Sequence, residues 1–388
     1  MVLLILAAVA ITAITEYNII ENANSAAQKY GDQANSENTT LGSYNTEIDK
    51  YIGGAAGGTG SGEGSGSGTG TGTVQTIAFA DAQKAEMLQK TVNSKVFDEF
   101  GNQIVVPAGF KIRVDETTNN ADNVTKGIVI EDESGNQFVW VPVGTIYTNA
   151  EKTELKTITL GRYYNFTATD GVYTPAQTAS DYETVTKIDV YYTEDTTSNH
   201  TKDNAIARNI GDFVNSSMQN GGYYIGRFEA GKDNNNTLVC KAGQTVYGDI
   251  TQPDSSTLCK NMYNNGADGY NAGTFSSDLI NSYAWDTAII FIQTFGGESD
   301  YYNQNNSTYF RKTGENGDEY CNINDMSGNA WEWTTETFGI SNHPCVYRGG
   351  SYDKSGETAG SYTSCRNYDY STYTPSILSF RPLLYVAL

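Results

Sequence analysis

The sequence predicts an α+β protein with a long N-terminal α-helical stem, a Gly/Ser/Thr linker and a loop-rich globular head. Three observations lead to this prediction: an apolar start that continues into a helical pattern, a tract of glycine and hydroxyl residues, and short alternating strands separated by Asn, Asp, Gly and Ser clusters. We divide the chain into a stem (1–52), a linker (53–73), an accessory strand/helix segment (74–126) and a head (127–388).

Composition and charge are typical of an exposed, loop-rich protein. Hydrophobic residues make up 38% of the 388 residues, enough for a core, and 40 glycines and 28 tyrosines are present. Charged residues make up only 18%, below the usual share of about 25%. With 24 Lys and Arg against 45 Asp and Glu, the net charge is −21, which excludes nucleic acid as a main partner.

The first fifteen residues, Met1–Thr15, are apolar or small and carry no charged side chain. As a helix they would span about 22 Å, short of a hydrocarbon core of about 30 Å. Apolar residues then recur at helical spacing from Ile19 to Ala34, which predicts one long helix. Two interpretations remain open: a helix that packs against copies of itself, and a membrane anchor with a helical stalk.

The stretch LLILAAVAITAITEYNIIENA resembles the N-terminal helix of type IV pilin-like proteins from Gram-positive bacteria. The resemblance implies a chain that enters the membrane, is assembled by pilus machinery, and packs this helix into the axis of an extracellular cell-surface filament. Its partners are then copies of itself in a helical homopolymer, and small alanines permit close helix approach. The residues expected to mediate polymerisation are Leu3, Leu4, Ile5, Leu6, Ala7, Ala8, Ala10, Ile11, Ala13 and Ile14.

Within the linker, residues 58–73 alternate Gly with Thr, Ser or a single Glu. Such a tract has no side chains to bury, so it is typical of a flexible tether. Strict alternation also allows an extended segment with every hydroxyl on one face, held in place by neighbouring subunits. Both interpretations stay open.

Short alternating runs predict strands in the segments that follow the linker, with two helices among them. The predicted strand regions are 102–114, 127–132, 137–148, 187–193 and 221–231, and the predicted helices are Ala80–Thr91 and Asn281–Phe295.

Three blocks near the C-terminus carry a second resemblance. They are Asp-Met-Ser-Gly-Asn-Ala-Trp-Glu-Trp at 325–333, Tyr-Arg-Gly-Gly-Ser-Tyr at 347–352 and Ser-Phe-Arg-Pro at 379–382. In this order they resemble the formylglycine-generating-enzyme/sulfatase-modifying-factor family, whose fold is a variant of the C-type lectin fold. Weaker matches at 138–144 and 223–229 extend the resemblance over roughly Gly127 to Leu388. The resemblance implies a C-type-lectin-like head.

The resemblance also implies a structural calcium site. Family members bind calcium through side-chain oxygens at the positions of Asp325 and Glu332 and main-chain carbonyls at those of Gly328 and Ala330. Oxygen ligands suit a hard cation such as Ca²⁺. Alternatively, the two carboxylates accept hydrogen bonds from backbone N–H groups of a tight turn.

The aromatic and basic residues of these blocks are expected to be structural. We expect Trp331 and Trp333 in the core, and Arg348 and Arg381 paired internally with carboxylates or carbonyls rather than with a ligand.

Catalysis is not expected. The oxidising branch of the family uses two cysteines five residues apart to bind copper; Cys365 matches the second, but Gly360 stands at the first. One thiolate does not supply the two sulfurs that Cu(I) prefers, so no copper is expected. The iron-dependent branch needs three histidines, and the chain has only His200 and His343.

Five cysteines lie in the last two-fifths of the chain, and Cys240, Cys259, Cys345 and Cys365 are the disulfide candidates. Outside the cell the five would form two disulfides and one free thiol; in a reducing cytosol they would be small buried residues. Cys365 is expected to pair with Cys345 or to be inert.

The loop between the last two blocks is rich in Tyr, Ser, Asn and Gly, the mixture that antibody paratopes use. In relatives with this fold the corresponding face binds substrate or receptor. Alternatively, these tyrosines are buried in the head or against a neighbouring subunit. The predicted contact residues are Tyr352, Tyr362, Arg366, Asn367, Tyr368, Tyr370 and Tyr373.

Together these features predict a structural subunit of a type IV pilus-like filament that displays a non-catalytic lectin-like head to a surface glycan or protein. The alternative is a monomeric, membrane-anchored adhesin that uses the same head. A formylglycine-type oxidase is the third interpretation.

Overall fold

The computed structural model describes residues 74–84, 91–163, 166–169, 172–175, 178–179, 204–263, 274–296, 307–337, 343–353 and 362–386. The chain divides into two units, Met1–Gly70 and Thr71–Leu388, and every described residue belongs to the second. The predicted stem and linker, with all ten polymerisation residues, lie outside the described residues. Within the described ranges, no helix is both long and apolar enough to span a membrane.

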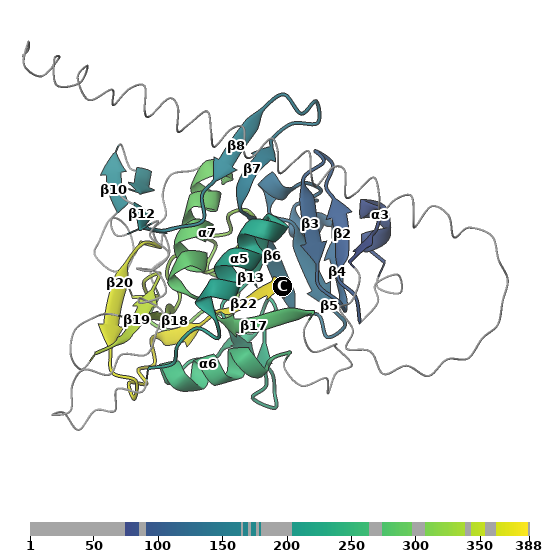
Figure 1. Cartoon of the computed structure of the whole chain (residues 1–388). Helices are drawn as coiled ribbons and strands as arrows, with labels where there is room; N and C mark the ends of the chain where they lie inside the picture. Colours follow the sequence, from purple (N-terminus) through teal and green to yellow (C-terminus); the bar gives the residue numbers. More distant parts are fainter. Residues whose placement is uncertain are drawn as a thin grey trace, which may run out of the picture. The chain divides into compact units, whose positions relative to one another are not determined.

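A six-stranded antiparallel sheet runs through the middle of the head (Figure 1). Each of its strands pairs with its neighbours in antiparallel register. In spatial order the strands are β17 (Phe275–Leu279), β22 (Pro382–Val386), β13 (Gly222–Gly226), β6 (Gln137–Pro142), β5 (Val129–Asp132) and β4 (Phe110–Arg113). The last strand of the chain, β22, is therefore paired on both sides, with β17 and with β13.

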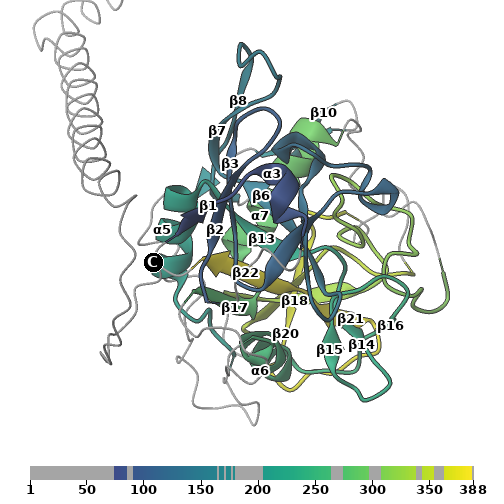
Figure 2. The ribbon, with the colours of Figure 1, turned by 90° about the vertical axis from the view of Figure 1, so that its right-hand side faces the viewer.

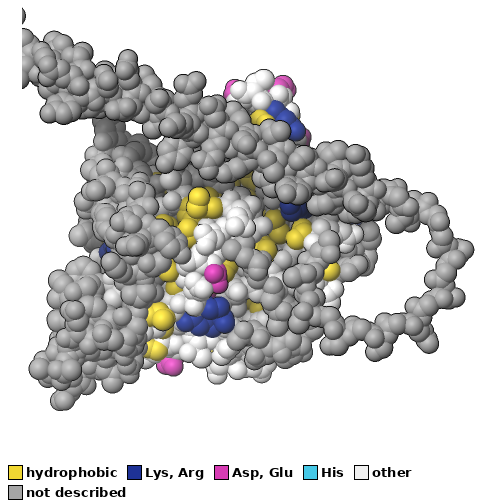
Figure 3. Space-filling model, in the orientation of Figure 1, with side chains coloured by type: hydrophobic (Ala, Val, Ile, Leu, Met, Phe, Trp, Pro, Cys, Tyr) yellow, Lys and Arg dark blue, Asp and Glu magenta, His cyan; other side chains and the backbone are white. Residues whose placement is uncertain are grey.

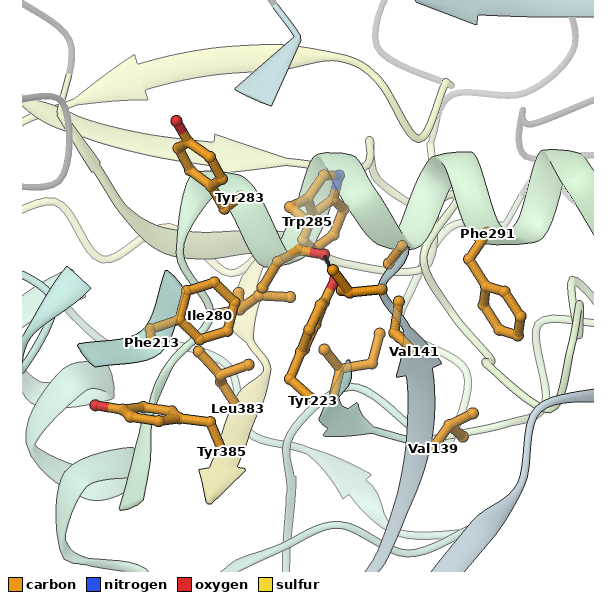
Figure 4. Close-up of a cluster of buried hydrophobic side chains, with 14 of the residues drawn as sticks. Val139, Val141, Phe213, Tyr223, Ile280, Tyr283, Trp285, Phe291, Leu383 and Tyr385 are labelled. Carbon is orange, nitrogen blue, oxygen red and sulfur yellow. Dashed lines mark hydrogen bonds between the residues drawn. The ribbon is translucent and has the colours of Figure 1, made fainter. Parts of the chain in front are cut away.

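One face of this sheet is covered by α5 (Ile210–Asn220) and α7 (Ser282–Phe295). Side chains alternate along a strand, so Val139, Val141 and Tyr223 all reach the same buried cluster (Figure 4). The Tyr223 hydroxyl donates a 2.7 Å hydrogen bond to the carbonyl of Ala284 in α7. This bond ties the helix to the middle of the sheet.

The other face packs on a second cluster that includes Phe138, Trp140 and Tyr224, the alternate residues of the same strands. Its partners come from a three-stranded sheet of β1 (Gln75–Thr76), β2 (Ser94–Phe97) and β3 (Gln103–Val106), and from α3 (Phe79–Ala82). Because β4 also belongs to the central sheet, the predicted accessory segment shares its core with the head.

A four-stranded sheet carries the C-terminal motifs (Figure 2). Its spatial order is β20 (Arg366–Asp369), β19 (Cys345–Arg348), β18 (Trp331–Thr337) and β21 (Leu378–Phe380), so β20 is an edge strand. Helix α6 (Gln252–Asn261) contacts β17 of the central sheet and β18 of the four-stranded sheet.

Short hairpins and ribbons complete the described residues. They are β7 (Gly144–Tyr147) with β8 (Leu155–Ile158), β9 (Arg162–Tyr163) with β12 (Thr178–Ala179), β10 (Phe166–Thr169) with β11 (Val172–Pro175), the β14–β16 sheet (Gly231–Lys232, Leu238–Val239, Thr245–Val246), and the 3-10 turns η2 (Glu116–Thr118) and η3 (Val124–Lys126).

The described part is mostly β-sheet with few helices, and four of the five predicted strand regions contain strands. The fifth, 187–193, lies outside the described residues. Helix α7 confirms the prediction for 281–295, and its Asn281 N-cap accepts a 2.9 Å bond from the amide of Ala284. Of the helix predicted at 80–91, the structure shows α3 up to Ala82, and residues 85–90 lie outside the described residues. Helices α5 and α6 were not predicted.

Candidate functional site

The predicted contact face includes β20, and two of its residues turn outward. Asn367 and Tyr368 are exposed, and Tyr368 keeps 39% of its surface accessible. Both lie on the edge strand, paired on one side only with β19. These side chains therefore keep part of their surface accessible to solvent.

Arg366, also predicted to contact a ligand, turns inward instead. Its Nε donates to both oxygens of Glu336, at 3.0 and 3.2 Å, and its Nη2 donates to Asp286. The side chain keeps only 20% of its surface accessible. Arg366 therefore anchors β20 to the interior of the head.

Arg348, from the Arg-Gly-Gly-Ser block, completes this buried ionic network. Its Nη2 lies 2.6 Å from Asp286 Oδ1, its Nη1 lies 3.3 Å from Glu336 Oε2, and its Nε donates a 3.0 Å bond to the carbonyl of Cys365. The guanidinium also lies 5.6 Å from the centre of the Trp285 ring. The predicted internal pairing of Arg348 is confirmed, and it joins β18, β19, α7 and the segment before β20.

The network holds Glu336 in its charged form. Burial alone would raise the pKa of Glu336, but the guanidinium groups of Arg366, Arg162 and Arg348 lower it to about 2. Arg162 of β9, which lies 174 residues earlier in the chain, donates to the same carboxylate. Neither Glu336 nor Asp286 was singled out from the sequence, because nothing local marks them.

The remaining tyrosines of the predicted face are partly buried. Tyr352 packs edge-to-face on Phe310, with ring centres 5.3 Å apart, and Tyr370 lies 3.9 Å from the His343 ring. Tyr373 packs against the core cluster beneath the four-stranded sheet. Tyr362 is also partly buried. These tyrosines contribute packing within the head, as the alternative interpretation allowed.

The two tryptophans of the Trp-Glu-Trp block are core residues, as predicted. Trp333 is fully buried and donates a 3.0 Å bond from Nε1 to the carbonyl of Ile250, while Trp331 is 7% exposed. Both rings pack edge-to-face on Tyr347 of β19, at 5.3 and 5.1 Å.

Asp325 lies in a buried, tightly turned loop with a left-handed backbone (φ 62°). Its Oδ2 accepts a 2.6 Å bond from the amide of Gly314, while its Oδ1 has no hydrogen-bond partner among the described residues. Asp318 accepts bonds from the amides of Asp325 and Ser327, at 2.9 and 3.0 Å. Burial, and next the charge of Asp318, raise the pKa of Asp325 well above its usual value.

Glu332 is bound by Arg381 of the Ser-Phe-Arg block. Arg381 Nε lies 2.9 Å from one carboxylate oxygen of Glu332, and Nη2 lies 2.5 Å from the other. Both side chains are completely buried. Burial raises the pKa of Glu332 to about 7, and Arg381 opposes that rise. The predicted internal pairing of Arg381 is confirmed.

These residues do not fit the calcium site that the resemblance implies. Both Glu332 oxygens already bind Arg381, and Asp325 bonds a local amide, as the alternative interpretation had it. Among the residues that the structure describes, no three Asp, Glu, His or Cys side chains are placed to hold a metal ion.

The sequence did not point to a further buried carboxylate, that of Glu229. Its Oε1 accepts a hydrogen bond from the Asn329 side chain, and its Oε2 has no hydrogen-bond partner in the described part of the chain. Burial, followed by the charges of Asp325 and Glu332, raises its pKa well above the usual value. The block at 223–229 contained it, but its contact with Asn329 spans 100 residues.

The five cysteines are free thiols, so neither predicted disulfide is formed in this structure. Cys345 lies opposite Asp369 in the β19–β20 register. Cys365 lies four residues before Asp369, which is about 13 Å along an extended strand. A disulfide needs Cα atoms within about 7 Å. Cys240 is buried, which raises its pKa to about 11. Gly360 lies outside the described residues.

A polar pocket of about 710 Å³ lies elsewhere on the head, beside the β5–β6 turn and the C-terminal end of α6. Glu133, Asp233, Lys241 and Tyr263 are among the residues that line it, and none of the predicted contact residues does. On the described part of the face in Figure 3, Lys and Arg side chains form small separate groups.

Comparison with known proteins gives one family match. The family described as "Sulfatase-modifying factor enzyme 1-like domain" matches residues 264–382. Among solved structures, "Crystal Structure of CarF" has a TM-score of 0.29 and 13% identity over 43% of this chain and 87% of that chain. "Treponema denticola variable protein 1" has a TM-score of 0.27 and 12% identity over 64% of this chain and 95% of that chain.

No curated protein matches the chain. The predicted blocks at 138–144 and 223–229 lie outside the matched range, and the three C-terminal blocks lie within it. The resemblance to the sulfatase-modifying-factor family is therefore confirmed for residues 264–382, the part that carries the four-stranded sheet, the ionic network apart from Arg162, and the Glu332–Arg381 pair.

Proposed function

We propose that this protein is a structural subunit of an extracellular type IV pilus-like filament, which displays a non-catalytic, lectin-like head for surface adhesion or recognition. The apolar, alanine-rich start of the sequence supports polymerisation through the N-terminal helix. In this proposal the chain sits in the membrane until pilus machinery assembles it with copies of itself. The head then meets a surface glycan or protein outside the cell.

The observation that supports a binding role for the head is the arrangement of side chains on β20. Asn367 and Tyr368 are exposed on an edge strand, while Arg366 of the same strand is fixed by Glu336 and Asp286. Exposed side chains on a rigid base lose little freedom when they bind, which favours recognition. A tyrosine in that position offers a large amphipathic surface.

A non-catalytic head is supported by the surroundings of Cys365. Its amide bonds the carbonyl of Tyr362 and its carbonyl accepts from Arg348, so the backbone here serves the ionic network. The position five residues earlier, Gly360, has no sulfur to share a copper ion. Purified protein assayed for thiol oxidation with added copper should show no turnover; turnover that Cys365→Ser abolishes would establish the oxidase instead.

The filament proposal is tested by electron microscopy of material sheared from cells that express the chain. Wild-type chain should yield fibres, and Ala10→Glu should abolish them because a charge cannot pack into an apolar helix bundle. A matched Thr71→Glu substitution in the linker should leave fibres intact. Chain recovered only as detergent-dependent single particles would establish the membrane-anchored adhesin.

A further inference from the structure

We infer that the guanidinium group of Arg381, rather than a calcium ion, is the cation that neutralises Glu332 in this head. The inference starts from the geometry of the pair. Two nitrogens of Arg381 bind the two oxygens of Glu332 at 2.9 and 2.5 Å, a forked arrangement that uses the whole carboxylate. Both side chains are completely buried, so water does not compete for either group.

Arg381 also makes the cross-links that a structural ion would make. Its Nη1 donates to the carbonyl of Gly226 at the end of β13, and its Nη2 donates to the carbonyl of Asn324 in the buried loop, both at 2.8 Å. With Glu332 on β18, one side chain joins the central sheet, the loop and the four-stranded sheet. Its own position precedes β22, so the C-terminal strand is tied to the same point.

A calcium ion would have to compete with this group for Glu332. Calcium takes six to eight oxygens at about 2.3–2.6 Å, and the family's ligand set includes Glu332. Binding there would make a divalent cation and the buried Arg381 guanidinium share the oxygens of one carboxylate, which places two like charges side by side. An uncompensated buried charge is strongly unfavourable. Folding of this head is therefore independent of calcium.

The direct test is the melting temperature of the full-length chain in detergent, followed by tryptophan fluorescence, in buffer with calcium chloride or with chelator. Trp331 and Trp333 flank Glu332 and report on this region. The wild-type melting temperature should be the same in both buffers and in magnesium. A rise specific to calcium that is lost in Asp325→Asn would overturn the inference.

Three variants sharpen the result. Glu332→Gln should lower the melting temperature equally with and without calcium; a loss seen only in calcium buffer would show that the ion, and not Arg381, is the partner. Arg381→Met should create a calcium response that wild type lacks, because it frees the Glu332 oxygens. Arg348→Met, the same change in the other buried network, should gain no such response, and an equal gain there would count against Arg381. If Arg381→Met does not fold, the wild-type and Asp325→Asn measurements still decide.

Discussion

Three arginines surround one carboxylate beneath β20. Arg162 of β9, Arg348 of β19 and Arg366 of β20 all donate to Glu336. Buried ion pairs contribute little net stability compared with apolar packing, but breaking one leaves an uncompensated charge. The network therefore fixes how the segment before β20 lies against β18 and α7 (through Asp286), and it makes Glu336 a sensitive position.

Replacing Glu336 by Gln should lower the free energy of unfolding by about 3–5 kcal/mol, because three guanidinium groups lose their shared counter-charge. Urea unfolding at pH 7 measures this change. The control is Asp122→Asn, which removes an exposed i,i+4 partner of Lys126 and should cost less than about 1 kcal/mol. Equal effects of the two substitutions would show that the network carries no structural role.

Glu336 also determines how the stability of the head falls at low pH. Its pKa is lowered from 4.5 to about 2 in the folded state, so the stabilisation is present above about pH 4.5 and is lost as the pH falls toward 2. Between those values, wild-type stability should fall and approach that of Glu336→Gln. Parallel pH profiles for the two proteins would contradict this assignment.

At the scale of single elements, alternation of side chains made the central strands predictable. Val139 and Val141 alternate with Phe138 and Trp140, and both sets are buried because both faces of the sheet are covered. Helix α6 was missed because its buried face is polar: Gln252, Ser255, Ser256 and Cys259 show no apolar period. Tertiary hydrogen bonds hold this helix instead, such as the 2.8 Å bond from the side-chain Nε2 of Gln252 to the carbonyl of Thr334.

Helix α7 depends on its N-cap. Asn281→Ala removes the side-chain oxygen that accepts from the Ala284 amide and should cost about 0.5–2 kcal/mol of stability. Asn281→Ser, which keeps an acceptor, should recover most of the loss. Thermal or urea unfolding measures both variants, and an Ala variant as stable as wild type would show that the cap contributes nothing.

We expect the exposed side chains of β20 to be needed for binding but not for the stability of the fold. Tyr368→Ala should abolish or strongly weaken retention of the protein on glycan and cell-surface protein arrays, while unfolding changes by no more than about 0.5 kcal/mol. Phe97→Ala, an exposed aromatic residue of β2 that is 47% accessible, is the matched control and should bind normally. Loss of binding in both variants, or in neither, would argue against β20 as the contact face.

At the scale of the whole molecule, the contacts that build the site join residues far apart in sequence. Arg348 meets Asp286 across 62 residues, and Arg381 meets Glu332 across 49. The motifs predicted that these arginines pair internally, but periodicity and spacing do not reveal which carboxylate each one finds. Glu332 was expected as a metal ligand because of the family resemblance, and Arg366 as a contact residue because of the composition of its loop.

The thiols offer a test of the whole fold. All five cysteines are free, and Cys240, Cys259 and Cys345 are buried. Alkylation without reductant, followed by mass spectrometry, should modify five cysteines in denaturant and should leave these three unmodified in the native protein. A mass short by two or four alkyl groups in denaturant would reveal one or two disulfides and contradict the structure.

The central claim, a filament subunit with an outward-facing head, is tested most directly by immunogold electron microscopy of sheared fibres with antibody raised against the head. The account predicts label along the whole length of the fibres, and no fibres from cells lacking the chain. Label confined to the membrane fraction, beside unlabelled fibres that persist in cells lacking the chain, would contradict it.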